Sequence, residues 1–207
     1  MPKHKDYEDK DGIRYYSVTT MLGIIRKPEL ERWRGDKGNQ IADQILEVAQ
    51  DFGTAFHEYA RIINAGKGHE IDLDEVSEGL QAKVKWYRDW YFENVEEVIM
   101  AEENIYSKKF QFKGTPDLVA KLKSIRTVAI VDYKTGNNIY RDVNYQLSAY
   151  KEGVKEYKGI AIRDRIILHL PRDKHKNKMI VLDPNTHESD FNGFLMAGQL
   201  FRNWSKK

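Results

Sequence analysis

Two charged side chains follow directly on an apolar run in the stretch "GTPDLVAKLKSIRTVAIVDYKTG", residues 114–136. Residues 128–131 are apolar at four successive positions, which predicts a strand that is covered on both faces and lies at the centre of a sheet. Because side chains alternate along a strand, Asp132 and Lys134 are expected on one face of its end and Tyr133 on the other. An acid and a base are thereby predicted to face one cleft.

A second acid, Asp117, precedes this strand and is predicted to lie opposite Asp132. The intervening residues are predicted to form an antiparallel hairpin that turns near residues 124 and 125, and that register pairs the two aspartates. Directly opposed residues have Cβ atoms ~5 Å apart, and two carboxylates at that separation repel by roughly 3 kcal/mol at an effective dielectric of about 20. A positive group must therefore offset the two charges.

Lys134 supplies one positive charge, whereas a hard divalent cation supplies two and bridges both carboxylates at ~2.1 Å per oxygen. Mg²⁺ or Mn²⁺ held in this way can polarise a phosphoryl oxygen and lower the pKa of a bound water, while a nearby lysine orients that water. The predicted chemistry is phosphodiester hydrolysis. The alternative is purely structural: Asp117 caps the turn after Pro116, Asp132 ends a strand, and Lys134 pairs with either acid.

Several motifs around these residues occur in an informative order. "TPD", fourteen intervening residues and "DYK" together resemble the signature of the PD-(D/E)XK nuclease superfamily. Upstream, "GTAFHEYA" resembles the histidine-bearing helix of the RecB-type exonuclease branch, and downstream "YQLSAY" resembles its Gln-x-x-x-Tyr helix. The resemblance implies an α/β fold with a restriction-endonuclease-like core, in which helices flank a central mixed β-sheet, and with a helical N-terminal extension.

The resemblance also implies roles for individual residues. Asp117 and Asp132 match the metal-binding acids, and Lys134 matches the catalytic lysine. The backbone carbonyl of Tyr133 matches a further metal ligand, and His57 matches the extra ligand of the RecB-type branch. For His57, which borders an apolar helical stripe, the alternative is a packed or capping residue.

Three further residues are candidates for supporting the site or binding DNA. Gln146 and Tyr150 are four residues apart, so they share a helix face and could contact a DNA phosphate or the lysine, although Tyr150 also fits a pure packing role. Glu102 matches a glutamate that related proteins often carry before the Pro-Asp turn. Strand alternation sends Glu102 and Glu103 to opposite faces, and an exposed acidic pair is the alternative.

The composition narrows the cofactors and partners. The chain has no cysteine, which excludes an iron–sulfur cluster and thiolate metal sites, so any metal is bound by oxygen or imidazole nitrogen. The resemblance is therefore to cluster-free members of phage type or mitochondrial-genome-maintenance type. No GxxxxGK[ST] loop is present, so ATP-driven unwinding would come from a helicase or recombination partner. The net charge of +2 does not decide whether DNA binds.

The remaining pattern predicts one domain, residues 1–207, that begins with a flexible tail at 1–12. No apolar run of ~18 residues could span a membrane and no secretory signal is evident, so we expect a cytoplasmic protein of a bacterium, a phage or a similar source. The first predicted elements are a strand at 13–18 and helices at 20–25, 28–33, 37–66 and 74–95, and Gly66 is predicted to end the third of these helices. They are followed by three successive strands within 96–107, 110–122 and 127–134, a helix at 141–159, strands at 163–170 and 179–183, and a helix at about 185–204.

These inferences predict a divalent-metal-dependent deoxyribonuclease, an exonuclease that acts on DNA ends or single-stranded DNA. A structure- or sequence-specific endonuclease of the same fold is one alternative. A catalytically silent nucleic-acid-binding module is the other, and the presence of both acids and the lysine argues against it.

Overall fold

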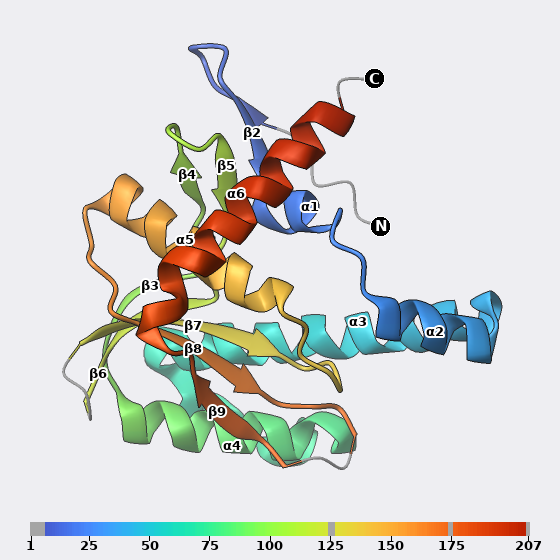
Figure 1. Cartoon of the computed structure of the whole chain (residues 1–207). Helices are drawn as coiled ribbons and strands as arrows, with labels where there is room; N and C mark the ends of the chain where they lie inside the picture. The colour runs from blue at the N-terminus through green and yellow to red at the C-terminus, as the bar shows by residue number, and fades with distance from the viewer. Residues whose placement is uncertain (1–6, 124–126, 174–175, 206–207) are drawn as a thin grey trace.

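The main sheet of the protein has five strands in the order β3-β6-β7-β8-β9 (Figure 1). The computed structural model describes residues 7–123, 127–173 and 176–205. Strands β7 and β8 are parallel and the other neighbours are antiparallel, so the sheet is mixed and β7 is its central strand, as predicted. The strands are β3 (Val95–Ala101), β6 (Leu118–Leu122), β7 (Val128–Lys134), β8 (Asp164–His169) and β9 (Lys178–Val181).

The predicted hairpin register is confirmed by the pairing of β6 with β7. Leu118 lies opposite Val131, and the pairing continues regularly towards the predicted turn. The same register, extended by one residue beyond the Leu118–Val131 pair, places Asp117 opposite Asp132. The turn itself, predicted at residues 124 and 125, lies outside the described residues.

A second, four-stranded sheet was not predicted. The segments expected as two single strands are each divided, and their parts belong to different sheets. The first division follows Glu102, whose positive φ of 49° turns the chain out of extended conformation, and the second falls at residues 115–117, which include Pro116. The second sheet has the order β1-β2-β5-β4 and consists of β1 (Tyr7–Glu8), β2 (Arg14–Ser17), β4 (Ile105–Ser107) and β5 (Phe112–Gly114).

Strand β1 lies within the segment predicted as a flexible tail. It pairs with β2, and the turn between them is fixed by Asp9. The Asp9 carboxylate accepts hydrogen bonds from the Ile13 amide and the Tyr15 hydroxyl, both at 2.9 Å. This local hydrogen bonding, typical of aspartate in turns, orders residues whose polar composition suggested a tail.

Helices cover both faces of the main sheet. Alternate residues of β7 contribute to two hydrophobic cores, one with α3 and α4 and the other with α1, α5 and α6. Helix α2 lies beside α3, outside both cores. The helices are α1 (Val18–Leu22), α2 (Pro28–Lys37), α3 (Asn39–Ile62), α4 (Glu78–Asn94), α5 (Asp142–Lys158) and α6 (His187–Trp204), with short helical turns η1 (Ile63–Lys67), η2 (Gly68–Glu70), η3 (Leu73–Glu75) and η4 (Pro184–Thr186).

The helix ends follow local sequence signals. Ser17 caps α1 by accepting a hydrogen bond from the Thr20 amide, so this helix begins two residues earlier than predicted. Pro28 occupies the first turn of α2, and Gly66, with φ of 79°, interrupts the helical conformation after α3 as predicted. Within the described ranges, no helix is long and apolar enough to cross a membrane.

Candidate active site

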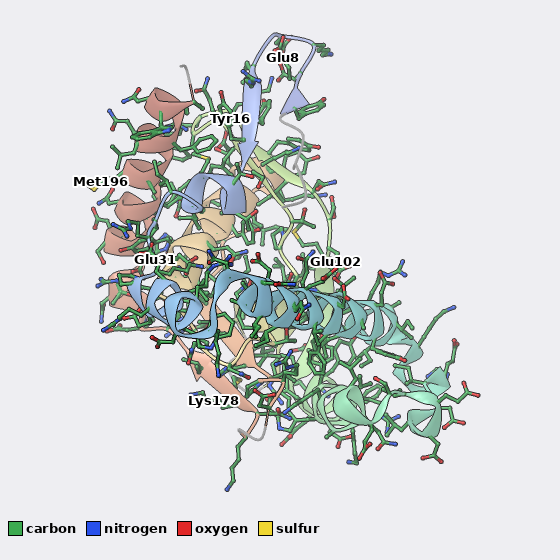
Figure 2. All side chains as sticks on the ribbon, turned by 90° about the vertical axis from the view of Figure 1, so that its right-hand side faces the viewer. Glu8, Tyr16, Glu31, Glu102, Lys178 and Met196 are labelled. Carbon is green, nitrogen blue, oxygen red and sulfur yellow. The ribbon has the colours of Figure 1, made fainter. Side chains whose placement is uncertain are left out.

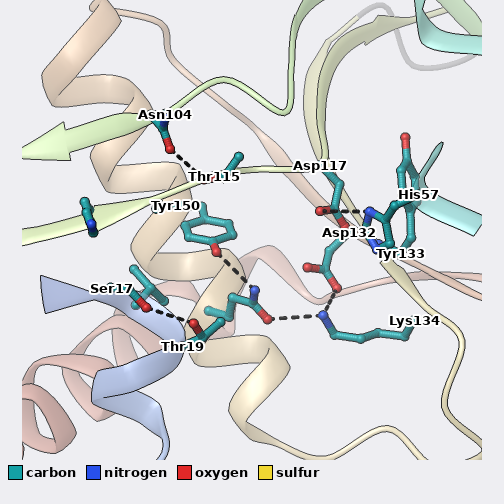
Figure 3. Close-up of a pocket in the computed structure, with 14 residues that line it drawn as sticks. Ser17, Thr19, His57, Asn104, Thr115, Asp117, Asp132, Tyr133, Lys134 and Tyr150 are labelled. Carbon is teal, nitrogen blue, oxygen red and sulfur yellow. Dashed lines mark hydrogen bonds and ion pairs between the residues drawn. The ribbon is translucent and has the colours of Figure 1, made fainter. Parts of the chain in front are cut away.

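A cavity of about 360 Å³ lies where the β6–β7 end of the main sheet meets the second sheet (Figure 3). It brings together side chains that are far apart in the sequence and come from three helices and both sheets. Most of the predicted site residues line it: His57, Asp117, Asp132, Tyr133, Lys134, Gln146 and Tyr150.

Asp132 and Lys134 form an ion pair on one face of β7, as strand alternation predicted. Their Oδ2 and Nζ atoms are 2.6 Å apart, and the Asp132 side chain is only 3% exposed. Burial alone would lower the pKa of Lys134, but the negative charges of Asp132 and Asp117 outweigh it and raise that pKa above its ordinary value. Lys134 is therefore an ammonium at neutral pH.

Asp117 is held by the backbone of the neighbouring strand. Its Oδ2 accepts a hydrogen bond of 2.7 Å from the Tyr133 amide, and its Oδ1 lies 3.8 Å from His57 Nδ1. Burial raises the pKa of Asp117 to about 6, and the charge of Asp132 adds to this effect. A second cation beside Lys134 would therefore stabilise the two carboxylates.

The end of β7 is fixed from both sides through Tyr133. Its side chain lies on the opposite face from Asp132, where its hydroxyl joins Tyr87 and Asn64 in a buried hydrogen-bonded cluster. The N–H and C=O of a strand residue point to the same side, so the Tyr133 carbonyl points towards the strand that carries Asp117. The extended register places Tyr133 opposite Pro116, which has no N–H to offer this carbonyl.

His57 reaches the site from α3, and Glu102 reaches it from the end of β3. The Nδ1 of His57 and the Oε1 of Glu102 are 3.4 Å apart. The Glu102 amide donates to the carbonyl of Asp117 at 3.3 Å, which ties its left-handed backbone to the Pro-Asp turn. Glu103 instead pairs with Lys158 at 2.5 Å, so Glu102 is the member of this pair that the structure brings to the site.

A hydrogen-bonded chain links the lysine to α5. Lys134 Nζ donates to Gln146 Oε1 at 3.2 Å, and Gln146 Nε2 donates to the Tyr150 hydroxyl, also at 3.2 Å. The Tyr150 ring packs against Gly114, where a Cβ atom would lie only 2.3 Å from Cε1 of the ring. Burial raises the pKa of Tyr150 to about 12. Tyr150 therefore combines the packing role with a hydroxyl directed at the site, and Gln146 contacts the lysine.

Sequence reasoning did not identify the residues that form the wall of the cavity opposite His57. It contains polar side chains from the second sheet and its connections: Ser17, Thr19, Asn104, Lys113 and Thr115. The Thr115 hydroxyl donates to Asn104 Oδ1 at 2.9 Å, so these side chains are themselves ordered. The available signal was "KGTPD", in which the lysine and threonine directly precede the Pro-Asp pair.

The residues gathered in the cavity include the donor types that a hard divalent cation takes, two carboxylates and an imidazole nitrogen. Among the residues that the structure describes, no three His, Asp or Glu side chains are close enough to hold a metal ion as they stand. Lys134 lies against Asp132 as its counter-charge. The site thus fits a divalent cation by donor type and by its excess of acidic groups, and its side chains would have to close in around the ion.

Comparison with known proteins gave matches only among solved structures. No family model matches the sequence, and no curated protein does. SSO0001 is similar over 92% of this chain and 78% of its own, with 13% identity and a TM-score of 0.40. A protein of Eubacterium rectale that is provisionally assigned as an exonuclease is similar over 90% of this chain and 79% of its own, with 10% identity and a TM-score of 0.44.

Proposed function

We propose that the protein is a divalent-metal-dependent nuclease that hydrolyses phosphodiester bonds in DNA, and that it acts as an exonuclease on DNA ends or single strands. The observation that carries this proposal is the meeting of Asp117, Asp132 and Lys134 in one cavity. A protein has no stability reason to oppose two buried carboxylates at a strand end, because their repulsion disfavours the fold.

The metal ligands in this proposal are the carboxylates of Asp117 and Asp132, the imidazole of His57 and the backbone carbonyl of Tyr133. These are hard oxygen donors and one imidazole nitrogen, which suits Mg²⁺ or Mn²⁺. When bound, the ion would polarise a phosphoryl oxygen and lower the pKa of the attacking water. Glu102, which lies beside His57, would orient that imidazole by hydrogen bonding.

In this proposal, Lys134 supplies a positive charge beside the scissile phosphate. Because the neighbouring acids keep it protonated, its ammonium can donate a hydrogen bond to a phosphate oxygen or to the attacking water. The Gln146 Oε1 accepts a hydrogen bond from this ammonium and thereby limits the directions in which it can point. Tyr150 holds Gln146 in turn, so both residues position the lysine.

The polar wall of the cavity suits a nucleic-acid backbone. Lys113 and the hydroxyls of Ser17 and Thr19 offer the donor groups that proteins direct at phosphate and sugar oxygens. The sequence lacks a Gly-rich phosphate loop of the GxxxxGK[ST] type, so any ATP-driven unwinding of a duplex would come from a helicase or recombination partner. The substrate proposed for the isolated protein is accordingly a DNA end or a single strand.

The proposal is tested by incubating purified protein with end-labelled linear DNA and Mn²⁺ or Mg²⁺. The wild type should shorten the DNA, and Asp132→Asn or Lys134→Ala should lower the rate by roughly 100-fold or more. Asp89→Asn, which changes an exposed acid on α4, is the matched control and should keep the wild-type rate. Wild-type rates in the two site variants would refute the mechanism. Nicking of closed circular DNA at a rate similar to end trimming would make the protein an endonuclease.

A further inference from the structure

A second cavity, of about 440 Å³, lies between α2, the N-terminal half of α3 and the loop that follows β7. Its apolar lining includes Leu30, Trp33, Ile45, Leu46 and Tyr140. None of these side chains belongs to either hydrophobic core, and none of the residues of α2 is buried. The apolar residues here therefore lie outside the two cores that hold the main sheet and its helices together.

Trp33 is the most informative residue in this cavity. Within the described part of the chain it makes no hydrogen bond and no ring contact, although it is half-buried at the cavity wall. Leu30 precedes it by three residues and lines the same cavity, so one face of α2 is apolar and turned inward. An indole that lines a cavity and has no aromatic partner among the described residues offers a stacking surface for a planar ligand.

The aromatic ring on the other side is held in place. Tyr140 carries the Lys27 ammonium 5.0 Å from its ring centroid, and the same ammonium pairs with Asp142 at 2.7 Å. This pair also ties the segment before α2 to the start of α5. Trp33 and Tyr140 therefore come from segments that the Lys27–Asp142 ion pair connects.

The rim of the cavity is polar and partly acidic. The amides of Asn137 and Asn138 lie there, together with the carboxylates of Glu29 and Asp173 and the guanidinium of Arg172. Arg172 pairs with Asp173 at 3.4 Å, and Asn137 Nδ2 donates to Asp173 Oδ2 at 2.6 Å. Amides can hydrogen-bond to the edges of nucleobases, whereas carboxylates repel phosphate groups. Because Arg172 is paired with Asp173 and Glu29 adds a further negative charge, the described residues of the rim offer no excess of positive charge for a phosphate and suit a neutral, planar, hydrogen-bonding group.

The cavity neighbours the proposed active site along β7 and α3, although the two cavities share no lining residue within the described parts of the chain. Its loop begins at Thr135, directly after Lys134, and its wall on α3 runs towards His57. Ala49 and His57 are eight residues apart on α3, which corresponds to about 12 Å along a helix. In Figure 2, Glu31 of α2 and Glu102 lie at different places along α3. A stacked strand rises about 3.4 Å per nucleotide, so the cavity lies roughly two to four nucleotides from the proposed scissile phosphate.

We infer that this cavity binds one unpaired nucleobase of the DNA substrate, which inserts beside Trp33 and Tyr140 while its backbone continues to the active site. The inference rests on the proposed nuclease function and adds a single-strand-specific subsite to it. Every base has a π-face, so stacking on Trp33 would be tolerant of sequence. A base that is still paired in a duplex could not enter, and the subsite would select single strands.

The test is an abasic scan of a single-stranded oligonucleotide, with KM for Mn²⁺-dependent cleavage measured for each position. In the wild type, removal of the base at one position two to four nucleotides from the cleaved bond should raise KM by roughly 5- to 150-fold. Trp33→Ala should raise KM for the intact oligonucleotide by a similar factor and lose its sensitivity to that abasic position. Trp33→Phe should restore both, and Trp204→Ala, at an exposed tryptophan on α6, is the matched control.

The outcomes separate the two proposals. If the wild type cleaves but no abasic position changes its KM, or if Trp33→Ala keeps the wild-type abasic profile, the nucleobase subsite is refuted while the nuclease function stands. The same holds if the cavity takes an apolar side chain of a partner protein, because oligonucleotide cleavage by Trp33→Ala would then be normal. If the wild type hydrolyses neither the oligonucleotide nor bis(p-nitrophenyl) phosphate with Mn²⁺, the proposed function itself is refuted.

Discussion

At the scale of single residues, Asp117 is ionised at neutral pH although its surroundings raise its pKa. Burial and the neighbouring Asp132 raise its pKa from 3.8 to about 6. A raised carboxyl pKa means that the folded protein binds this proton more tightly than the unfolded chain does. The folded state therefore loses stability as the pH rises from about 4 to about 6, and the loss remains at higher pH.

Asp117→Asn should consequently stabilise the metal-free protein at pH 7.5, by roughly 2 to 3 kcal/mol of unfolding free energy, and much less at pH 4. The asparagine oxygen can still accept the hydrogen bond from the Tyr133 amide, so the strand end is preserved. Urea unfolding at the two pH values in the presence of a chelator measures the difference. Asp89→Asn, at an exposed site, should show no such pH-dependent gain. Equal stability of Asp117→Asn and wild type at pH 7.5 would contradict the assigned cause.

The candidate residues themselves were largely predictable, because alternation along one strand and the spacing of the two acids are properties of the sequence. The register that opposes Asp117 and Asp132 was predicted correctly from the hairpin alone. The hydrogen bonds that link Lys134, Gln146 and Tyr150 were only partly predicted, because the sequence does not determine which side chains Gln146 contacts. Lys113 was missed because the second sheet that carries it was not predicted.

At the scale of the elements, the close contact between β5 and α5 positions Tyr150. Gly114 leaves room for the tyrosine ring, and an added Cβ atom would clash with it at 2.3 Å. Gly114→Ala should therefore destabilise the protein by about 1 to 3 kcal/mol and reduce nuclease activity, because the ring and its hydroxyl must shift. The stability change is measured by thermal or urea unfolding.

Two further variants isolate the cause of that effect. Gly136→Ala, where the nearest atom would lie 3.7 Å from the new Cβ, should be nearly neutral. In the Tyr150→Ala background, Gly114→Ala should cost much less than in the wild type, because the clashing ring is gone. An unchanged cost in that background would show that Gly114 matters for another reason.

Most elements were predicted within a few residues, because helical and strand periodicities are strong in α3, α4, α5 and β7. The division of the first two predicted strands between two sheets was not predicted. It depends on a positive φ angle at Glu102, which this residue type does not prefer, and on the Pro116 turn between β5 and β6. Tertiary contacts decide such positions, as the bonds from the Glu102 amide to the Pro-Asp turn illustrate.

At the scale of the whole molecule, a buried ion pair joins the sheet to the helices behind the site. Arg165 on β8 and Asp190 on α6 are 2.8 Å apart, with side chains 1% and 2% exposed. Arg165 also donates to Ser148 on α5 and to the carbonyl of Asp183. All the groups that this guanidinium bonds lie away from the cavity with the proposed catalytic residues.

Asp190→Ala should destabilise the protein by about 3 to 5 kcal/mol, because it leaves the Arg165 charge buried without its counter-ion. The double variant Arg165→Met with Asp190→Leu should be considerably more stable than Asp190→Ala, since it removes both charges while retaining apolar volume. Urea unfolding of the two variants checks this. A double variant that is less stable than Asp190→Ala would mean that the pair supplies more than charge balance.

The central claim, that the cavity hydrolyses DNA with a divalent cation held by its two acids, is tested most directly by a metal titration of the cleavage rate. The rate is measured on labelled single-stranded DNA at rising Mn²⁺ concentrations for the wild type and for Asp117→Asn. We predict no cleavage in excess chelator, a saturable rise in the wild type, and a curve for Asp117→Asn that is lower and shifted to higher Mn²⁺. Wild-type cleavage that persists in excess chelator, or an identical curve for Asp117→Asn, would contradict the claim.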